Sequence, residues 1–455
     1  MSATMHESRQ SPRPPRLPAG LPLIGHGLQL LRRRLEFLQE ARRYGPVVRV
    51  GLGPSTAYLV NDHTLLHQML VKDAALFPRG IHFRKARAVA GDGIITAEGP
   101  PHRRQRRLVL PAFNRKRVHG YSDVMRQIAT ERISSWPEDE PIELKPEFVS
   151  LATTIGTRTL FSTELGAAAV SVIERALPVL TRGVSLRAMD PTGLVEHLPL
   201  PANRRFDATM RELHQVIDGI IASYRRTEQQ GDDLLSLLMV ATDEGSGQGM
   251  TDLQLRDEVI SILLSSAETT ALTMSWACHE LGQHPEVFRA LRAEVDRVLP
   301  DGEAPRHEQL VDLELTRRVV KETLRLYPPT YFLSRSATAD VRLGDHLIPR
   351  GSTVLYSFYS QHRDPTLFRD PNSFDPDRWL PERAADVTVE AYMPFGEGAH
   401  RCVGEGFAWA EAMTSLAIIA AQRDLRPVNG AAVRPTGTVT LMPRGLSMVL
   451  PRRAG

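Results

Sequence analysis

One of the chain's two cysteines lies in a glycine-rich loop, MPFGEGAHRCVGEG, which runs from Met393 to Gly406. Cys402 has no second cysteine nearby, so a zinc or iron–sulfur site would lack ligands there. A catalytic nucleophile would need a neighbouring base, which His400 could supply. A lone cysteine is more often a buried and inert side chain. The residue type alone therefore leaves a reactive and an inert thiol open.

The glycines beside Cys402 favour a further interpretation. Glycine lets the backbone approach a flat ligand closely and turn amide groups toward the sulfur, which stabilises a thiolate. The following sequence, EGFAWAEAMTSLAIIAAQ, predicts a helix over 403–422. The N-terminus of that helix would also favour a negative charge on the sulfur. A thiolate bonded to a haem iron fits this arrangement.

A long helix is predicted to begin at Thr251, where Gln254 completes a capping box, and to end near Gly282 and Pro285. Its roughly 30 residues would span about 45 Å, the width of a whole domain. The middle is apolar nearly all round, which indicates burial. A polar island interrupts it at Ser265, Ser266, Glu268, Thr269 and Thr270. The island is either a set of satisfied core hydrogen bonds or part of a site.

A charged constellation occurs in KETLRLYPP and FDPDRW. Glu322 and Arg325 share a helix face, which Pro328 then ends. Such a pair is most often a weak surface ion pair. Arg378, about 50 residues later, offers a third charged member that could bury the pair.

Taken together, these segments resemble the cytochrome P450 family. The haem loop of that family matches FGEGAHRCVG, from Phe395 to Gly404. The other matching elements follow in the expected order: His102 and Arg106 in PPHRRQRR, Glu268-Thr269-Thr270, Glu322-x-x-Arg325, and Phe374 to Trp379. The resemblance extends over essentially everything after the N-terminal tail.

The resemblance implies a mainly α fold with small β-sheets, in which haem b lies between the long central helix and the cysteine loop. Cys402 would be the axial ligand of the haem iron, Phe395 would pack against the haem and limit access to the thiolate, and Gly398 would also be among the haem-binding residues. The haem propionates would bind His102, Arg106, Arg335 and His400. Glu322, Arg325 and Arg378 would form a buried structural triad.

The resemblance also assigns chemistry to the polar island. O2 would be the co-substrate, and Glu268 and Thr269 would deliver protons during its activation. The chain departs from the family at Ser265 and Ser266, where Ala-Gly is usual. We expect Ser265 to face the substrate pocket.

The expected reaction is insertion of one oxygen atom into an apolar small molecule. Its pocket would be lined by Leu264, Ser265, Tyr331, Phe332, Leu333, Val439 and the segment 77–95. Segments such as LPLPANRRF resemble bacterial terpene-oxidising members of the family, of the pentalenene type. We therefore expect a sesquiterpene-like substrate of secondary metabolism. Fatty acid, steroid or macrolide hydroxylation, or a haem-binding role without oxygenation, are the alternatives.

Composition limits the partners. The 455 residues carry 56 basic and 53 acidic side chains, a net charge of +3, which argues against a general nucleic-acid binder. No apolar run is long enough for a membrane anchor. Two distant cysteines favour a reducing cytoplasm. We expect a disordered Pro/Arg-rich tail over 1–20, one catalytic domain over 21–455, and a monomer.

Electrons would come from a separate ferredoxin and its reductase, because the sequence contains neither a flavin domain nor an iron–sulfur motif. A basic docking face could be formed by Arg103, Arg104, Arg107, Arg115, Lys116 and Arg117.

Periodicity predicts the remaining elements. Helices are expected over 34–43, 101–110, 122–136, 204–226, 233–241, 285–299 and 313–326. Three strand pairs are expected: 47–50 with 57–60, 341–343 with 353–357, and 439–442 with 446–450.

Overall fold

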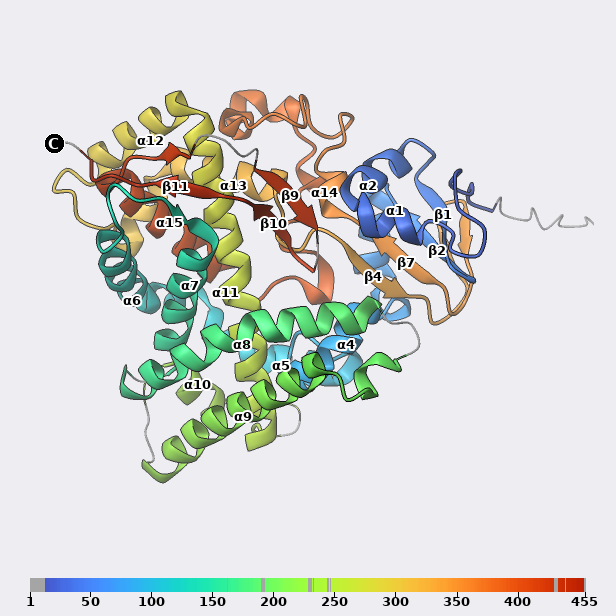
Figure 1. Cartoon of the computed structure of the whole chain (residues 1–455), viewed down its shortest axis with the longest axis horizontal. Helices are drawn as coiled ribbons and strands as arrows, with labels where there is room; N and C mark the ends of the chain where they lie inside the picture. The colour runs from blue at the N-terminus through green and yellow to red at the C-terminus, as the bar shows by residue number, and fades with distance from the viewer. Residues whose placement is uncertain are drawn as a thin grey trace, which may run out of the picture.

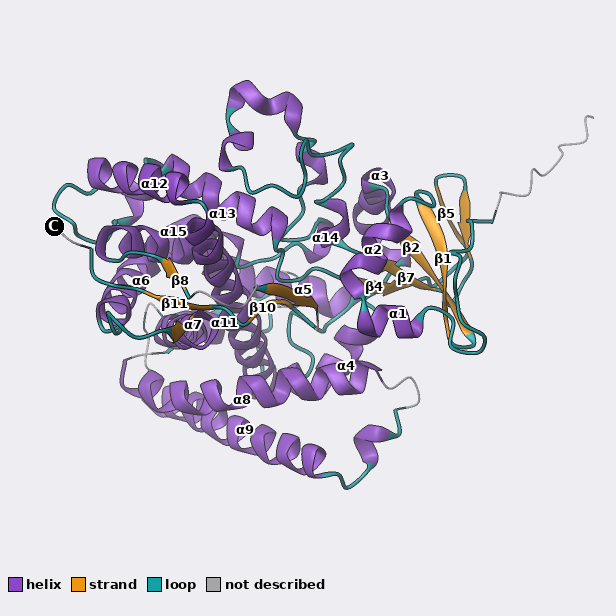
Figure 2. Ribbon diagram, turned by 45° about the horizontal axis from the view of Figure 1, so that its top comes forward, coloured by secondary structure: helices purple, strands orange, loops and turns teal. Residues whose placement is uncertain are grey.

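The computed structural model describes residues 13–161, 163–189, 193–227, 231, 233–243, 245, 247–428, 433–437 and 439–453. Helices form most of this part of the chain, and the largest sheet lies at one end of the molecule (Figures 1 and 2). The predicted class, mainly α with small sheets, is confirmed.

The helices are α1 Gly27–Arg32, α2 Arg34–Arg42, α3 His63–His67, α4 Ile81–Ala90, α5 Gly99–Val109, α6 Arg115–Ser134, α7 Leu144–Leu160, α8 Thr163–Met189, α9 Pro201–Thr227, α10 Leu234–Val240, α11 Asp252–Gln283, α12 Pro285–Val298, α13 Glu314–Leu326, α14 Phe358–Gln361 and α15 Glu405–Gln422. The strands are β1 Val47–Leu52, β2 Ser55–Val60, β3 Ile142–Glu143, β4 Leu333–Ser336, β5 Val341–Leu343, β6 His346–Ile348, β7 Thr353–Tyr356, β8 Arg426–Pro427, β9 Arg434–Gly437, β10 Leu441–Arg444 and β11 Ser447–Val449.

The central helix α11 forms as the sequence predicts. The Thr251 side chain accepts a hydrogen bond from the Gln254 amide, and the Gln254 side chain accepts one from the Thr251 amide, so the capping box is confirmed. The helix runs for 32 residues and is buried along most of its length. It crosses the middle of the molecule, with α7 and α15 packed against it (Figure 1). Side chains on α11 can therefore form one wall of a central cavity.

Helix α8 was not predicted from the sequence. It contains Pro178, which removes one backbone donor from the helix interior and normally disfavours a helix. Packing against α4, α7 and α9 compensates for this local weakness. Tertiary contacts therefore decide the structure of a segment whose own pattern is ambiguous.

The largest sheet has the strand order β1-β2-β7-β4. The predicted hairpin is confirmed, since Val47 lies opposite Val60 and Val50 opposite Ala57. The predicted pairing of 341–343 with 353–357 is wrong. β5 pairs with β6, whereas β7 lies parallel to β2 and antiparallel to β4. Alternation identifies a strand but not a partner that is distant in the sequence.

The predicted hairpin near the C-terminus is wrong for the same reason. β10 pairs with β9, and β11 lies between β3 and β8. The two predicted strands therefore belong to different sheets. Val439 and Thr440, which directly precede β10, line the central cavity.

Part of the predicted N-terminal tail is ordered against the sheet. Leu17 is buried in an apolar cluster with Leu38 and Val50. Its amide donates to the Arg49 carbonyl at 3.0 Å, and the Arg49 amide donates to Pro15 at 2.8 Å. The assignment of 13–20 to a disordered tail is therefore wrong, and residues 1–12 lie outside the described part.

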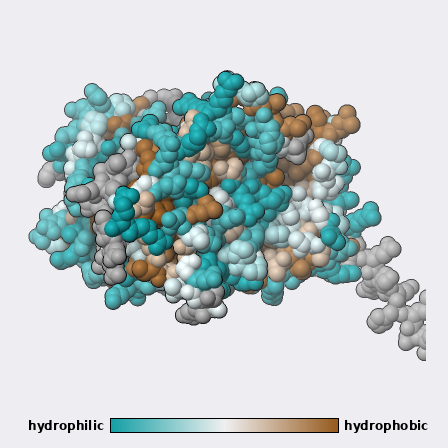
Figure 3. All heavy atoms as spheres, turned by 90° about the horizontal axis from the view of Figure 1, so that it is seen from below, coloured by the Kyte–Doolittle hydropathy of each residue, from teal (hydrophilic) through white to brown (hydrophobic). Residues whose placement is uncertain are grey.

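None of the helices in the described ranges is both long enough and apolar enough to cross a bilayer. The face on the side of α8 and α9 is largely hydrophilic, with small separate apolar patches (Figure 3).

Glu322, Arg325 and Arg378 meet in a fully buried cluster. Arg325 binds the carboxylate with two nitrogens at 2.8 and 2.9 Å, and Arg378 Nε binds it at 3.0 Å. Trp379 Nε1 adds a further hydrogen bond at 3.0 Å. Arg325 Nη1 also donates to the carbonyl groups of two loop residues, at 2.6 and 2.7 Å. The cluster therefore ties α13 to the segment that precedes the cysteine loop.

Replacing Glu322 with alanine should destabilise the protein by about 3–5 kcal/mol, because two buried guanidinium groups would lose their counter-charge. Arg318→Ala is the matched control. Arg318 Nη2 lies 3.0 Å from Asp377 Oδ1, so this ion pair joins the same two segments, but Asp377 is exposed. Removing the pair should therefore lower the free energy of unfolding by less than about 1 kcal/mol. Urea unfolding of both variants measures the difference. Equal losses would show that the buried cluster is not special; Glu322→Gln provides a milder variant if the alanine protein does not fold.

Candidate active site

A cavity of about 430 Å³ lies between α11 and the cysteine loop. Most of its wall is aliphatic or aromatic. Its polar groups lie in the cysteine loop, along a basic edge beside that loop, in a stripe on α11, and at separate positions that include His82 and Thr159.

The cysteine loop depends on backbone shapes that glycine adopts most readily. Gly396 and Gly398 have φ angles of +71° and +67°. A Cβ atom on Gly398 would lie 2.3 Å from the Leu70 carbonyl oxygen, so no side chain fits there. The Cys402 amide donates to the Phe395 carbonyl at 2.9 Å, which closes the loop. Phe395 and Cys402 line the cavity, whereas Gly398 shapes the loop from behind.

The surroundings of the Cys402 sulfur act in opposite directions. Burial raises the pKa of the thiol, while the Gly404 amide and the guanidinium groups of Arg106 and Arg401 oppose that rise. An amide at the sulfur is what the sequence predicts, and the two guanidinium groups add to its effect, but in the protein alone burial outweighs them. A metal ion bonded to the sulfur would reverse the balance, because a coordinated thiol loses its proton.

The basic edge combines residues from three separate segments. His102 and Arg106 come from α5, Arg335 comes from β4, and His400 comes from the cysteine loop; all four line the cavity. The rings of His102 and His400 have centroids 4.3 Å apart. Arg79, which the sequence did not single out, completes the edge and donates to the Ile94 carbonyl at 2.9 Å.

Charges at this edge are strongly coupled. Burial, then His400 and Arg79, lowers the pKa of His102 to about 3, so this ring is neutral at pH 7. Burial would raise the pKa of Glu98, but hydrogen bonds from His400 and the Arg79 amide lower it to about 2. The arginines therefore leave the edge cationic despite one carboxylate.

The residues fit a haem. Arg335 Nε and His400 Nδ1 are buried and have no hydrogen-bond partner among the described residues. Unsatisfied buried donors are costly, and the two carboxylates on one edge of a haem would satisfy them. The Cys402 sulfur faces the same cavity and offers the iron an axial ligand.

Helix α11 presents a polar stripe to the cavity. The stripe follows helical spacing and consists of Ser265, Ser266, Thr269, Thr270 and Thr273. The Ser265 hydroxyl donates to the Ser261 carbonyl at 2.7 Å, and the Thr269 hydroxyl donates to the Ser265 carbonyl at 2.7 Å. Their oxygen atoms can still accept hydrogen bonds from groups in the cavity.

Glu268 does not line this cavity, although it is adjacent to Thr269. Its position lies off the stripe, and its carboxylate is 3.1 Å from Lys145 Nζ on α7. Lys145 also lies 2.9 Å from the Met442 sulfur on β10. Glu268 would have to leave Lys145 to reach the cavity, a constraint that the sequence could not reveal.

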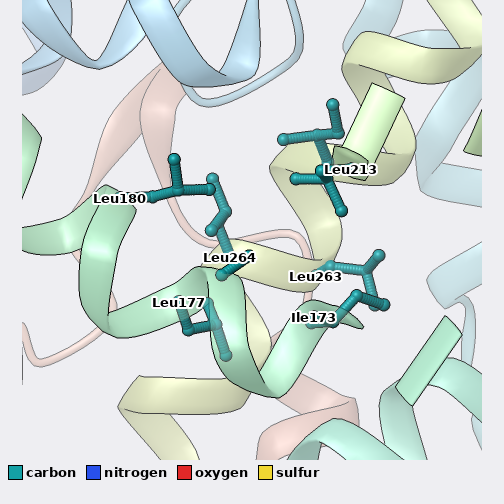
Figure 4. Close-up of a pocket in the computed structure, with 8 residues that line it drawn as sticks. Ile173, Leu177, Leu180, Leu213, Leu263 and Leu264 are labelled. Atoms are coloured by element: carbon teal, nitrogen blue, oxygen red, sulfur yellow. The ribbon is translucent and has the colours of Figure 1, made fainter. Parts of the chain in front are cut away.

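Four of the six predicted substrate-wall residues line the cavity: Ser265, Phe332, Leu333 and Val439. Leu264 does not. It points between α11, α8 and α9 into a small apolar gap with Leu177, Leu180 and Leu213 (Figure 4). Successive residues on a helix differ by about 100° in direction, and Leu264 precedes Ser265 at the edge of the stripe, so its side chain points away from the cavity.

Tyr331 is the other exception. It is fully buried, and its hydroxyl accepts a hydrogen bond from Arg34 at 2.9 Å. A Cβ atom on Gly437 would lie 2.4 Å from that hydroxyl. Tyr331 therefore supports the structure beside the cavity.

Other wall residues come from helices whose orientation the sequence did not fix. His82, Phe83 and Ala86 of α4 fall within the expected segment 77–95. Thr159 of α7 and Val184 of α8 were missed, because their contribution depends on how those helices pack.

Three comparisons with known proteins agree with this geometry. Residues 15–437 match the family model described as cytochrome P450. Cyclooctatin synthase of Streptomyces melanosporofaciens is 42% identical over 434 residues, which cover 95% of this chain and 94% of that protein. Pentalenene oxygenase of Streptomyces avermitilis is 36% identical over 437 residues, covering 96% and 97% respectively.

A second protein of Streptomyces melanosporofaciens, cyclooctat-9-en-7-ol 5-monooxygenase, is 38% identical over 91% of this chain and 90% of its own length. Among solved structures, the haem domain of cytochrome P450DA superposes with a TM-score of 0.88. Its sequence identity is 25%, over 97% of this chain and 98% of that chain.

Gly398→Ala should weaken cofactor retention at least about tenfold, because the added Cβ has no space and the φ angle is strained. Gly406→Ala is the matched control. It lies in α15, and its Cβ would make only ordinary contact with Val118 at 3.9 Å. The ratio of haem to protein absorbance after gel filtration reports retention. Full retention in Gly398→Ala would contradict the tight fit of the loop.

Proposed function

The chain belongs to the cytochrome P450 family, and from this premise we propose that its substrate is a cyclic terpenoid. The enzyme is a haem-dependent monooxygenase that uses O2. The observation that carries the substrate class is the likeness, over nearly the whole chain, to proteins named for cyclooctatin, cyclooctat-9-en-7-ol and pentalenene.

The cavity wall supports an apolar, compact substrate. Phe83, Val184, Phe332, Leu333 and Val439 come from separate segments and surround the space with apolar surface. Such a wall binds hydrocarbon skeletons mainly by removing their surface from water.

A fatty acid is less well supported than a terpenoid. The arginines that line the described cavity are Arg79, Arg106, Arg335 and Arg401, and they lie beside the cysteine loop. The cofactor's own carboxylates would engage this edge, which leaves little cationic surface for a substrate carboxylate. Steroid and macrolide substrates remain the alternatives that an assay must test.

The protein's own groups have defined tasks in this proposal. Cys402 would hold the iron, while His102, Arg106, Arg335 and His400 would hold the haem carboxylates. When bound, haem supplies the thiolate-ligated iron at which O2 is reduced and cleaved. The apolar wall orients the substrate and excludes bulk water.

Proton delivery is proposed for Thr269 and Glu268. Thr269 faces the cavity, and its hydroxyl must release the Ser265 carbonyl before it can donate a proton there. The Glu268 carboxylate must separate from Lys145 Nζ and take a proton from water before it can resupply Thr269 Oγ1. The ion pair with Lys145 would thus control when the carboxyl group is available.

A ferredoxin is the proposed electron donor. Arg103, Arg115 and Lys116 are exposed on α5 and α6. Helix α5 contacts the cysteine loop, since Arg106 Nη1 donates to the Arg401 carbonyl at 2.7 Å. Arg104 and Arg107 contribute less freely, because Arg104 binds the Gly249 carbonyl and Arg107 binds Asp243. A basic face suits an acidic partner and would speed its encounter. Cytoplasmic location and a monomeric state stay predictions.

The haem-loaded protein should oxygenate cyclic terpenoids when ferredoxin, its reductase and NADPH are supplied, because the wall is apolar and the relatives act on such molecules. The panel should contain cyclic terpenes and terpene alcohols, a fatty acid, a steroid and a macrolide, with products identified by mass spectrometry. Turnover of another class with no terpenoid product would contradict the proposal. Product formation without ferredoxin would contradict the proposal that ferredoxin donates the electrons.

The same assay also tests whether Thr269 delivers protons. Thr269→Val should lower the product formed per NADPH severalfold, with the lost electrons appearing as hydrogen peroxide. Thr273→Val, one turn further along the same cavity face, is the matched control and should change this ratio less. Equal ratios in both variants would remove Thr269 from the proposed path.

A further inference from the structure

We infer that the substrate already carries a hydroxyl group when it reaches this enzyme, and that His82 and Thr159 are the side chains that bind such groups. The inference rests on the proposed cyclic terpenoid substrate and narrows that class to terpenoid alcohols. Both side chains line the cavity, and each carries a buried polar atom that has no hydrogen-bond partner among the described residues.

Few atoms satisfy both conditions. The buried side-chain atoms of the described wall that lack a hydrogen-bond partner are His82 Nδ1, Thr159 Oγ1, Arg335 Nε, Glu397 Oε2 and His400 Nδ1. The last three belong to the basic edge and the cysteine loop. His82 and Thr159 come from α4 and α7, which supply none of the residues assigned to that edge, and Phe83 and Leu160 beside them in the sequence also line the cavity.

His82 is suited to a neutral polar group. Burial, with a smaller contribution from Arg34, lowers the pKa of this imidazole to about 4, so it is neutral at pH 7. A neutral imidazole has one donor and one acceptor nitrogen. A hydroxyl group can meet either nitrogen, because it both donates and accepts.

Thr159 offers a second position. Its side chain is only 4% exposed, and its hydroxyl makes no hydrogen bond to the described residues. Leu160, the next residue in the chain, also lines the cavity and is apolar. Leaving such a group unpaired against a bare hydrocarbon costs free energy that an oxygen atom on the substrate would recover.

An alcohol substrate also defines the preceding reaction. That step must introduce the hydroxyl group, either by an earlier monooxygenation or by a terpene cyclisation that ends with the addition of water. The present enzyme would then add a further oxygen atom to a substrate whose existing hydroxyl group is bound by His82 or Thr159.

Spectral titration of the haem-loaded protein tests the inference without turnover. The probes are the tricyclic hydrocarbon cedrene and the tricyclic alcohol cedrol. The wild-type protein should bind cedrol about tenfold more tightly, the effect of one satisfied buried hydrogen bond. His82→Phe and Thr159→Val should each reduce the preference for cedrol, unless the remaining residue alone binds the hydroxyl group. The double variant should abolish the preference, while its affinity for cedrene changes less than about twofold.

Matched controls separate this role from a structural one. Thr153→Val lies on the same helix α7 and also removes a buried, unpartnered hydroxyl, but Thr153 does not line the cavity, so the preference should persist. His82→Gln keeps a donor and an acceptor and should restore part of the preference.

The outcomes distinguish the two levels of the argument. Equal wild-type affinity for both probes, or a preference that survives in the double variant, overturns the hydroxyl-binding role and leaves the terpenoid assignment standing. Failure of both terpenes to bind, while the fatty acid, steroid or macrolide does, overturns the terpenoid assignment and this inference with it.

Discussion

The Cys402 sulfur must face the cavity at a fixed position, and most of the surrounding structure serves that requirement. The loop turns at two glycines with positive φ angles, and the Leu70 carbonyl leaves no space beside Gly398. The hydrogen bond from the Cys402 amide to Phe395 closes the turn, and α15 begins directly beyond it. A side chain on such a closed loop needs little reorganisation to bind a metal.

The buried cluster around Glu322 extends this constraint into the fold. It joins α13 to the segment before the cysteine loop through hydrogen bonds to both side chains and carbonyl groups. On the opposite wall, α11 is held by tight packing along its length. The cavity therefore has two rigid walls, and the shorter helices α4, α7 and α8 complete it. Substrate selection can vary on these helices without disturbing the thiol.

Local chemistry made the cysteine loop, the capping box of α11 and the Glu322–Arg325 pair predictable, because each depends on residue types at short spacing. Arg378 is distant in the sequence, and the family resemblance placed it in the cluster. The strand pairings of β7, β10 and β11 were not predictable, since alternation does not name a distant partner. Rotation about the axis of α11 separates Leu264 and Glu268 from the stripe that contains Ser265 and Thr269. Arg79, His82, Lys145 and Thr159 gained their roles only from packing between distant segments.

The most direct test of the account is the absorbance spectrum of the purified, reduced protein with carbon monoxide. A thiolate bond from Cys402 to the haem iron predicts a strongly red-shifted Soret band, and Cys402→His should bind haem without that shift. A wild-type protein that takes up no haem, or an unchanged spectrum in the variant, would contradict the central claim.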